Sequence, residues 1–213
     1  MSFLTYQLGF LSALIFFAVI HVWGRFIHKH ATIILWTFFI IALLTVFIDI
    51  PVVSEYIKSG HGSLGLFMLV IISGILPKKS FFYKDLLLVR GHIAVLAFIL
   101  LIPHGLERLY LALAGYQFTG LIAMILMIPL TITSFMFIRK KMKPIHWKNL
   151  HKLSYLAYVM IYIHIGFTIY LSSSTSYIVI MEDAILYHLF AIIYIFFKVR
   201  KTILRKKNKQ PSS

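Results

Sequence analysis

Apolar residues of this chain gather into seven long segments, which short polar connections separate. The segments cover residues 3–23, 31–53, 62–77, 91–106, 118–138, 150–171 and 182–198. Most of them approach the ~20 residues that a helix needs to cross a bilayer. The pattern therefore predicts an all-α fold, a polytopic membrane bundle of about seven transmembrane helices.

Lysine and arginine occur in every second connection. The regions 24–31, 78–90 and 139–152 and the tail from Lys198 carry two, four, six and seven of the 21 basic residues. The other connections hold most of the acidic residues: Asp49, Glu55, Glu107, Glu182 and Asp183. Because positively charged connections stay in the cytoplasm, we expect the N-terminus outside and the C-terminus in the cytoplasm.

The composition agrees with a multi-pass protein of the cell membrane. The chain is 61% hydrophobic and only 13% charged, with a mean hydropathy of +0.92, whereas soluble domains are about 25% charged. A net charge of +15 would also suit nucleic acid, but orientation and anionic lipid head groups already account for it. We therefore expect a lipid bilayer as partner and no nucleic acid. Cysteine is absent, which excludes disulfides and thiolate metal sites.

Six of the ten histidines lie within the apolar segments, and four of these six have a paired arrangement. His92 and His104 belong to the fourth segment, and His151 and His164 to the sixth. These two segments run in the same direction, so His92 and His151 have similar depths, as do His104 and His164. Ionisable groups inside a membrane indicate function, and two imidazoles can hold a haem iron from opposite sides. A separation of 13 residues is ~20 Å of helix rise, enough for two stacked haems.

Helical periodicity alone leaves the role of these histidines open. Steps of 12 and 13 residues place the two side chains of each segment on different faces of an ideal helix. Pro103 could kink the helix and redirect His104, and a bend or a local change of winding is expected between His151 and His164. The histidines could be paired ligands or packing residues between helices. A bare zinc site is disfavoured, because each pair supplies too few ligands.

Two stretches resemble a known membrane family. The first is RGHIAVLAFILLIPH, which starts at Arg90 and ends at His104. The second is TGLIAMILMIPLTITSFMFIRKKMKPIHWKNLHKLSYLAYVMIYIHIG, residues 119–166. They are similar to the ferric reductase-like transmembrane domain, the haem module of ferric reductases, NADPH oxidases and the haem subunit of periplasmic methionine sulfoxide reductase. The resemblance covers about residues 60–171. The matching residues of the second stretch are Gly120, Ala123, Pro129, Thr133, Ser134, Trp147, Lys148, Leu150, His151, Tyr155 and His164.

The resemblance implies b-type haem, one or two per chain. His104 and His164 would ligate an outer haem and His151 an inner one. His92, His146 or no protein histidine could oppose His151. Cytoplasmic basic residues could pair with haem propionates or with the phosphate of FMN or FAD; they are Arg90, Lys143, Lys148 and Lys152. Trp147 lies next to them at the expected membrane interface.

The resemblance also implies a division of the chain and a function. Residues 1–59 would form two additional N-terminal transmembrane helices, residues 60–200 the haem-binding bundle, and residues 201–213 a basic cytoplasmic tail. The expected function is that of an oxidoreductase-type subunit carrying electrons across the membrane to an external acceptor, either ferric iron or a periplasmic or surface redox protein. No Gly-rich dinucleotide fingerprint occurs in the sequence, so a separate flavoprotein reductase or a quinol would be the donor. The alternatives are a transporter and a structural or assembly subunit without haem.

Overall fold

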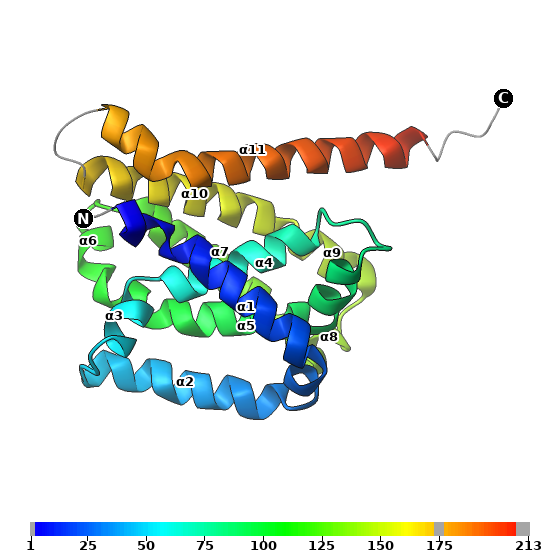
Figure 1. Ribbon diagram of the computed structural model, residues 1–213. Helices are drawn as coiled ribbons and strands as arrows, with labels where there is room; N and C mark the ends of the chain where they lie inside the picture. The colour runs from blue at the N-terminus through cyan, green and yellow to red at the C-terminus, as the bar shows by residue number, and fades with distance from the viewer. Residues whose placement is uncertain (1–2, 173–176, 208–213) are drawn as a thin grey trace.

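A computed structural model describes residues 3–172 and 177–207, and every regular element in these residues is an α-helix (Figure 1). The helices are α1 (Phe3–Lys29), α2 (Ala31–Phe47), α3 (Val53–Lys58), α4 (His61–Ser73), α5 (Phe81–Glu107), α6 (Leu109–Leu113), α7 (Phe118–Ile132), α8 (Met136–Arg139), α9 (Pro144–Leu150), α10 (Leu153–Ser172) and α11 (Tyr177–Lys207). The predicted all-α class is therefore confirmed. Residues 208–213 of the predicted tail, and the side chains of Glu182 and Asp183, lie outside the described part of the chain.

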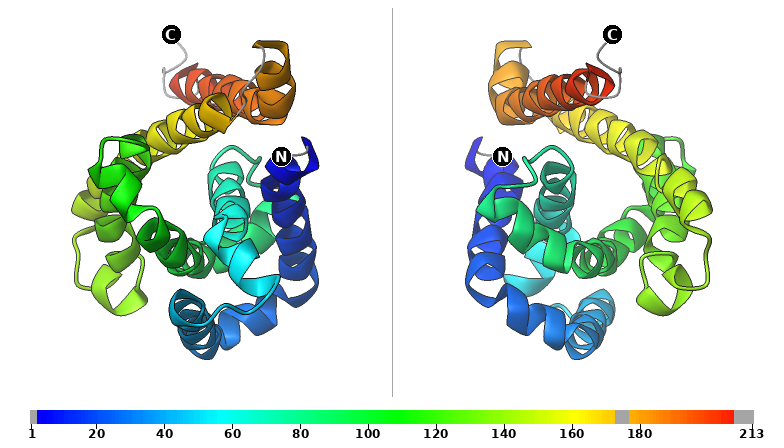
Figure 2. Two further views of the ribbon diagram at one scale, coloured as in Figure 1. Left: turned by 90° about the vertical axis from the view of Figure 1, so that its left-hand side faces the viewer. Right: turned by 90° about the vertical axis from the view of Figure 1, so that its right-hand side faces the viewer.

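Helix α4 forms the centre of the bundle. The end-on views show it between α1 and α5 (Figure 2), and it packs against both. Five consecutive residues, Leu66 to Val70, are buried, as expected for a helix that is apolar on all sides. A Cβ added to Gly65 would lie 2.8 Å from the backbone nitrogen of Ala13, so a glycine is needed for this close packing of α4 against α1.

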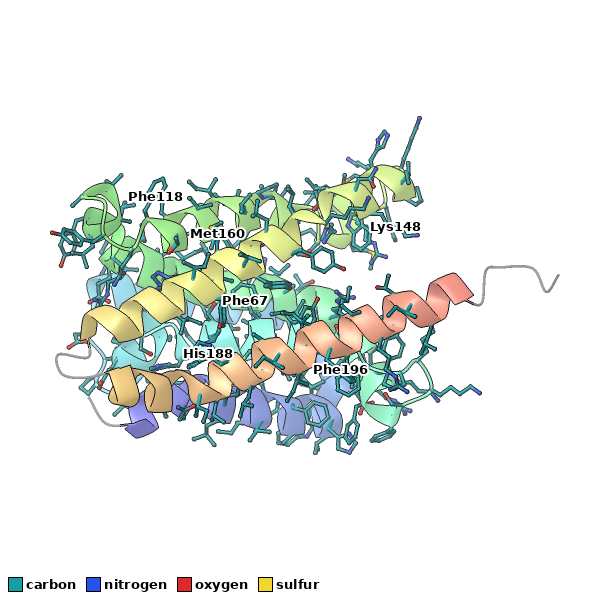
Figure 3. All side chains as sticks on the ribbon, turned by 90° about the horizontal axis from the view of Figure 1, so that it is seen from above. Phe67, Phe118, Lys148, Met160, His188 and Phe196 are labelled. Atoms are coloured by element: carbon teal, nitrogen blue, oxygen red, sulfur yellow. The ribbon has the colours of Figure 1, made fainter. Side chains whose placement is uncertain are left out.

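Two of the described helices are long and apolar enough to cross a membrane. They are the Gln7–Lys29 part of α1 and the whole of α5. Helices α2, α4 and α7 are apolar but shorter, with 17, 13 and 15 residues. Helices α10 and α11 run obliquely across one face of the bundle, with Phe67 of α4 beneath them (Figure 3).

Several helix boundaries differ from the predicted ones. Helix α5 begins at Phe81 rather than near residue 91, because the Ser80 side chain caps it by accepting a hydrogen bond from the Tyr83 backbone N–H (3.1 Å). Arg90, predicted in a connection, therefore lies within this helix. The helix of the sixth segment, α10, starts at Leu153 rather than at residue 150, and a turn separates it from α9, which ends at Leu150. His151 lies in this turn, while α10 runs without a break from Leu153 past His164, so the bend expected between the two histidines is confined to the turn at His151 and Lys152.

The basic connections meet at one end of the bundle, which we call the basic end. Residues 24–31, 74–80 and 139–152 lie there, while α3, α6 and the start of α7 lie at the opposite end (Figure 1). The labelled residues Lys148 and Phe118 mark these two ends in Figure 3. Asp85 is the one acidic residue in the basic stretches of sequence, and its carboxylate pairs with His21 at 2.8 Å.

Candidate functional site

The His104 ring of α5 and the His164 ring of α10 lie close together and nearly perpendicular to each other. Their ring centroids are 6.2 Å apart, and the ring planes are inclined by 78°. Sequence analysis predicted that these two residues share a depth in the bundle, and the structure brings them into contact. Helix α5 continues through Pro103 to Glu107, so His104 reaches this position from an uninterrupted helix.

The backbone of α3 orients the His104 ring. Nδ1 of His104 lies 2.7 Å from the carbonyl oxygen of Lys58. Because a carbonyl oxygen can only accept, Nδ1 carries the proton and donates it. The proton on Nδ1 leaves the Nε2 lone pair available for a metal, as second-shell hydrogen bonds do for metal-binding histidines.

Each of the two imidazole rings packs closely against a glycine. A Cβ on Gly60 would lie 3.2 Å from Nδ1 of His104, and Gly60 also has a φ of +81°, which favours glycine. A Cβ on Gly120 would lie 2.8 Å from both Nδ1 and Cε1 of His164. Any larger residue at position 120 would have to displace that ring. Gly120 belonged to the resemblance but was not predicted as a site residue, and Gly60 was missed, since only its conformation in the fold reveals its role.

The two imidazoles border a cavity of about 250 Å³. Its walls are mostly apolar and come from α4, α5, α7 and α10, while Arg108, Gln117 and His61 supply polar groups. His61 lies within hydrogen-bonding distance of the Ser59 hydroxyl (2.7 Å). Lys58 and Arg108 are the two basic residues outside the basic sequence regions, and both lie beside His104.

The distance between the His104 and His164 rings is compatible with a metal between them. A metal–imidazole bond is about 2 Å long, so two imidazoles that share one ion through ring nitrogens place their centroids roughly 6 Å apart. The observed 6.2 Å matches this spacing. Within the described residues there is no group of three or more metal-binding side chains. Two histidines are the number of protein ligands that a haem iron takes when both of its axial ligands are imidazoles.

The histidines expected to form an inner pair have other neighbours. Nε2 of His92 lies 3.3 Å from Nδ1 of His28 on α1. Nε2 of His151 lies 3.1 Å from the Thr133 hydroxyl, and its ring lies 4.2 Å from the Trp147 ring, centroid to centroid. Of the alternatives for the residue opposite His151, His92 is not found there, because its ring faces His28 of α1. The contact with His28 was missed; no periodic signal connects two residues 64 positions apart.

The basic residues predicted near the inner haem lie around His151 without forming a closed site. Arg90 and Lys148 are both exposed. Trp147 donates a hydrogen bond from Nε1 to the carbonyl oxygen of Thr133 (3.2 Å), and the Arg139 guanidinium lies 4.5 Å from the centroid of its ring. Through its hydrogen bond to Thr133, Trp147 attaches α9 to the end of α7.

Comparison with known proteins adds one relative. No protein-family model matches the chain, and no solved structure matches it. The chain is 26% identical over 165 residues to an uncharacterized protein of Treponema pallidum (strain Nichols). The alignment covers 71% of this chain and 46% of the relative, so the chain spans about half the length of the curated relative it matches.

Proposed function

We propose that this protein is a b-type haem protein of the membrane that transfers electrons to an external acceptor. One observation carries the proposal: the His104 and His164 rings, 6.2 Å apart, border a cavity and each lie against a glycine. The sequence resemblance to the ferric reductase-like transmembrane domain supports the same reading, since it identifies the same two histidines as ligands.

The proposal includes a seven-span membrane arrangement with the basic end in the cytoplasm. Helices α1, α2, α4, α5, α7, α10 and α11 would be the seven spans. The short helix α4 is enclosed by the others, so it need not match the ~30 Å of hydrocarbon on its own. The gathering of basic connections at one end (Figure 1) supports this orientation.

Each residue of the site has a defined task in this proposal. His104 and His164 would hold the iron, and bound haem with two histidine ligands supplies one-electron transfer without an open position for substrate. The Lys58 carbonyl holds the proton of His104 on Nδ1. The Arg108 guanidinium suits a carboxylate such as a haem propionate, and the apolar cavity wall excludes water.

Electrons would enter at the basic end. Its positive charge attracts an anionic flavin, FMN or FAD, or an acidic flavoprotein reductase, and Arg90 and Lys148 are exposed there. A membrane quinol is the other proposed donor. Ferric iron or a periplasmic or surface redox protein would accept the electrons at the opposite end, near Arg108.

The direction of transfer can be tested in proteoliposomes of sorted orientation. With reduced flavin on the side of the basic end, we expect an impermeant ferric chelate on the other side to be reduced. NADPH alone should give no reduction, because no dinucleotide fingerprint occurs in the sequence. Reduction only when donor and acceptor share one side would contradict transmembrane transfer. A purified protein without a haem spectrum would favour a transporter or an assembly subunit instead.

The absence of cysteine allows a direct test of topology. Tyr116→Cys and Ile145→Cys each replace an exposed residue, at 61% and 58% relative exposure, near opposite ends of the bundle. In intact cells, we expect an impermeant maleimide to label Tyr116→Cys and to label Ile145→Cys only after the membrane is disrupted. Labelling of both positions in intact cells would contradict the seven-span arrangement.

Haem stoichiometry tests the inner site. Because the His92 ring lies against His28, we expect His92→Ala to leave the ratio of haem to protein unchanged, as measured by the pyridine haemochrome assay. His151→Ala is the comparison variant, and a decrease in this variant alone would indicate a second haem that has a single protein histidine ligand. An equal decrease of haem content in both variants would indicate that His92 and His151 ligate the same haem. It would contradict the expectation that His92 is not a haem ligand.

A further inference from the structure

Two polar contacts join α1 to α5 near the basic end, and they follow one another at an interval of seven residues on both helices. In the first, Nδ1 of His21 lies 2.8 Å from the carboxylate of Asp85. In the second, Nε2 of His92 lies 3.3 Å from Nδ1 of His28. A proton on His21 strengthens the first contact, whereas the second needs one neutral imidazole as acceptor. The two contacts therefore respond to protons in opposite ways.

The backbone of α1 departs from helical geometry between these two contacts. Trp23 has φ −115° and ψ 16°, values outside the α-helical range, and Gly24 follows it directly. A Cβ added to Gly24 would meet a single atom within 4 Å, Cγ2 of Ile20 at 3.9 Å. Neither a close contact nor a positive φ requires a glycine here, so what glycine adds is backbone flexibility. Trp23 and Gly24 are therefore suited to act as a hinge.

Residues 24–29, which we call the α1 arm, are held more loosely than the helix before them. Before the hinge, the His21 ring also packs against the Phe81 ring of α5, with centroids 4.7 Å apart. Within the arm, Ile27 is the one side chain that packs against the main core. Four residues of the arm are exposed: Arg25, Phe26, His28 and Lys29. The hydrogen bond to His92 is therefore the polar contact that attaches the arm to α5.

The charges around the His28–His92 contact are mostly positive. Basic and imidazole groups come from α1, from its junction with α2 and from the first part of α5: Arg25, Lys29, His30, Lys84 and Arg90. The acidic group there is Asp85, whose carboxylate is already paired. Helix α2 has no ionisable side chain, α4 has only His61 at its opposite end, and α11 meets α1 at Phe10, in the other half of that helix. A second proton on the imidazole pair is therefore repelled by the first and by its surroundings.

We propose that the α1 arm swings away from α5 when acidification protonates both His28 and His92, while the ion pair of Asp85 keeps the preceding part of α1 in place. The arm carries Arg25 and Lys29 with it, so the swing rearranges positive charge at the basic end, where an anionic donor would enter. This consequence for the donor rests on the proposed function. The swing itself requires neither haem nor a donor.

The expected response has a defined steepness and size. The open arm leaves two protons on the imidazole pair and the closed arm at most one, so each pH unit below about 6.5 should raise the ratio of open to closed molecules about tenfold. The arm spans ~9 Å of helix, so a swing of about 30° at the hinge moves its end by roughly 5 Å.

Because the chain has no cysteine, spin labels can be attached at chosen positions of the protein in phosphatidylcholine nanodiscs. One label pair joins the arm to α5, Lys29→Cys with Leu88→Cys. The matched control keeps Leu88→Cys and moves the other label seven residues back, to Val22→Cys before the hinge. All three replaced residues are exposed. Between about pH 8 and about pH 5.5, pulsed electron paramagnetic resonance should reveal a second, longer distance in the first pair and an unchanged distance in the control.

Substitutions show whether the imidazoles and the hinge cause the movement. The His28→Gln/His92→Gln protein keeps a neutral pair that can form a hydrogen bond, and it should show one Lys29–Leu88 distance at both pH values. Gly24→Ala should lower the open population at low pH by up to about fivefold, the effect of helix propensity on a stiffer hinge. An open population as large as that of the parent protein would overturn the assignment of the hinge to Gly24.

Three results would overturn the proposal as a whole. The first is a Lys29–Leu88 distance that stays the same at low pH, and the second is an equal response in the double glutamine protein. The third is an equal change in the Val22–Leu88 control, since the whole of α1 would then move. The absorption spectrum of the same samples reports haem separately, so failure of the haem proposal is recognised on its own.

Discussion

Replacement of His104 or His164 by alanine is expected to remove haem from the cavity between α5 and α10. Each imidazole is one of two ligands, and the remaining one cannot hold the iron from both sides. Loss of a second-shell partner already lowers metal affinity about 10- to 100-fold, so loss of a ligand should lower haem affinity by on the order of a hundredfold or more. The measurement is the low-spin b-type absorption band of the purified protein, titrated with added haem.

The control for this experiment is another histidine of the same bundle. His188 on α11 lies against the Tyr162 hydroxyl of α10 and outside the cavity lining. His188→Ala also replaces an imidazole by a methyl group, and it should keep the full haem content. If His104→Ala and His164→Ala both retain haem at the level of this control, the ligand assignment is wrong.

Gly120→Ala should weaken haem binding although it improves the local helix propensity. The new Cβ would lie 2.8 Å from Nδ1 and Cε1 of His164, so the ring must move away from its position opposite His104. Overpacking of this kind costs about 1–3 kcal/mol, which corresponds to roughly five- to 150-fold in affinity. Haem titration followed by absorbance measures the loss of haem affinity. Thermal unfolding of the haem-free protein measures the effect of the substitution on stability.

Gly166→Ala is the matched comparison. Gly166 lies two residues after His164 in α10, and its added Cβ would meet no atom within 4 Å. Both substitutions exchange glycine for alanine in a helix and should favour helix by up to about 1 kcal/mol. Only Gly120→Ala should lower haem affinity. Equal affinities in the two variants would mean that Gly120 does not position the His164 ring.

The sequence by itself determined the helical class and the arrangement of charge. The lengths of the apolar segments and the alternation of basic connections predict which parts of the chain lie at the same end, because each long helix runs from one end of the bundle toward the other. Fixed rise per residue then sets the depth of every side chain. His104 and His164 were therefore predicted to lie at one depth, and the structure brings their rings to 6.2 Å. Sequence resemblance pointed to the same pair.

Local interactions changed the boundaries that hydropathy predicted. The Ser80 cap extends α5 back to Phe81 from the predicted start at residue 91. The ten added residues include charged ones. This extension places Arg90 in a helix. The turn at His151 separates α9 from α10. Hydropathy averages over a segment, and it does not register a single capping hydrogen bond or a two-residue turn.

Only the tertiary structure decided which neighbour each side chain meets. His92 has the depth expected for a partner of His151, yet its ring faces His28 of α1. The Lys58 carbonyl that orients His104 comes from the end of α3, 46 positions earlier in the chain. Depth follows from one helix alone, whereas the direction of a side chain toward a partner depends on the rotation and packing of two helices, which short-range sequence patterns do not encode.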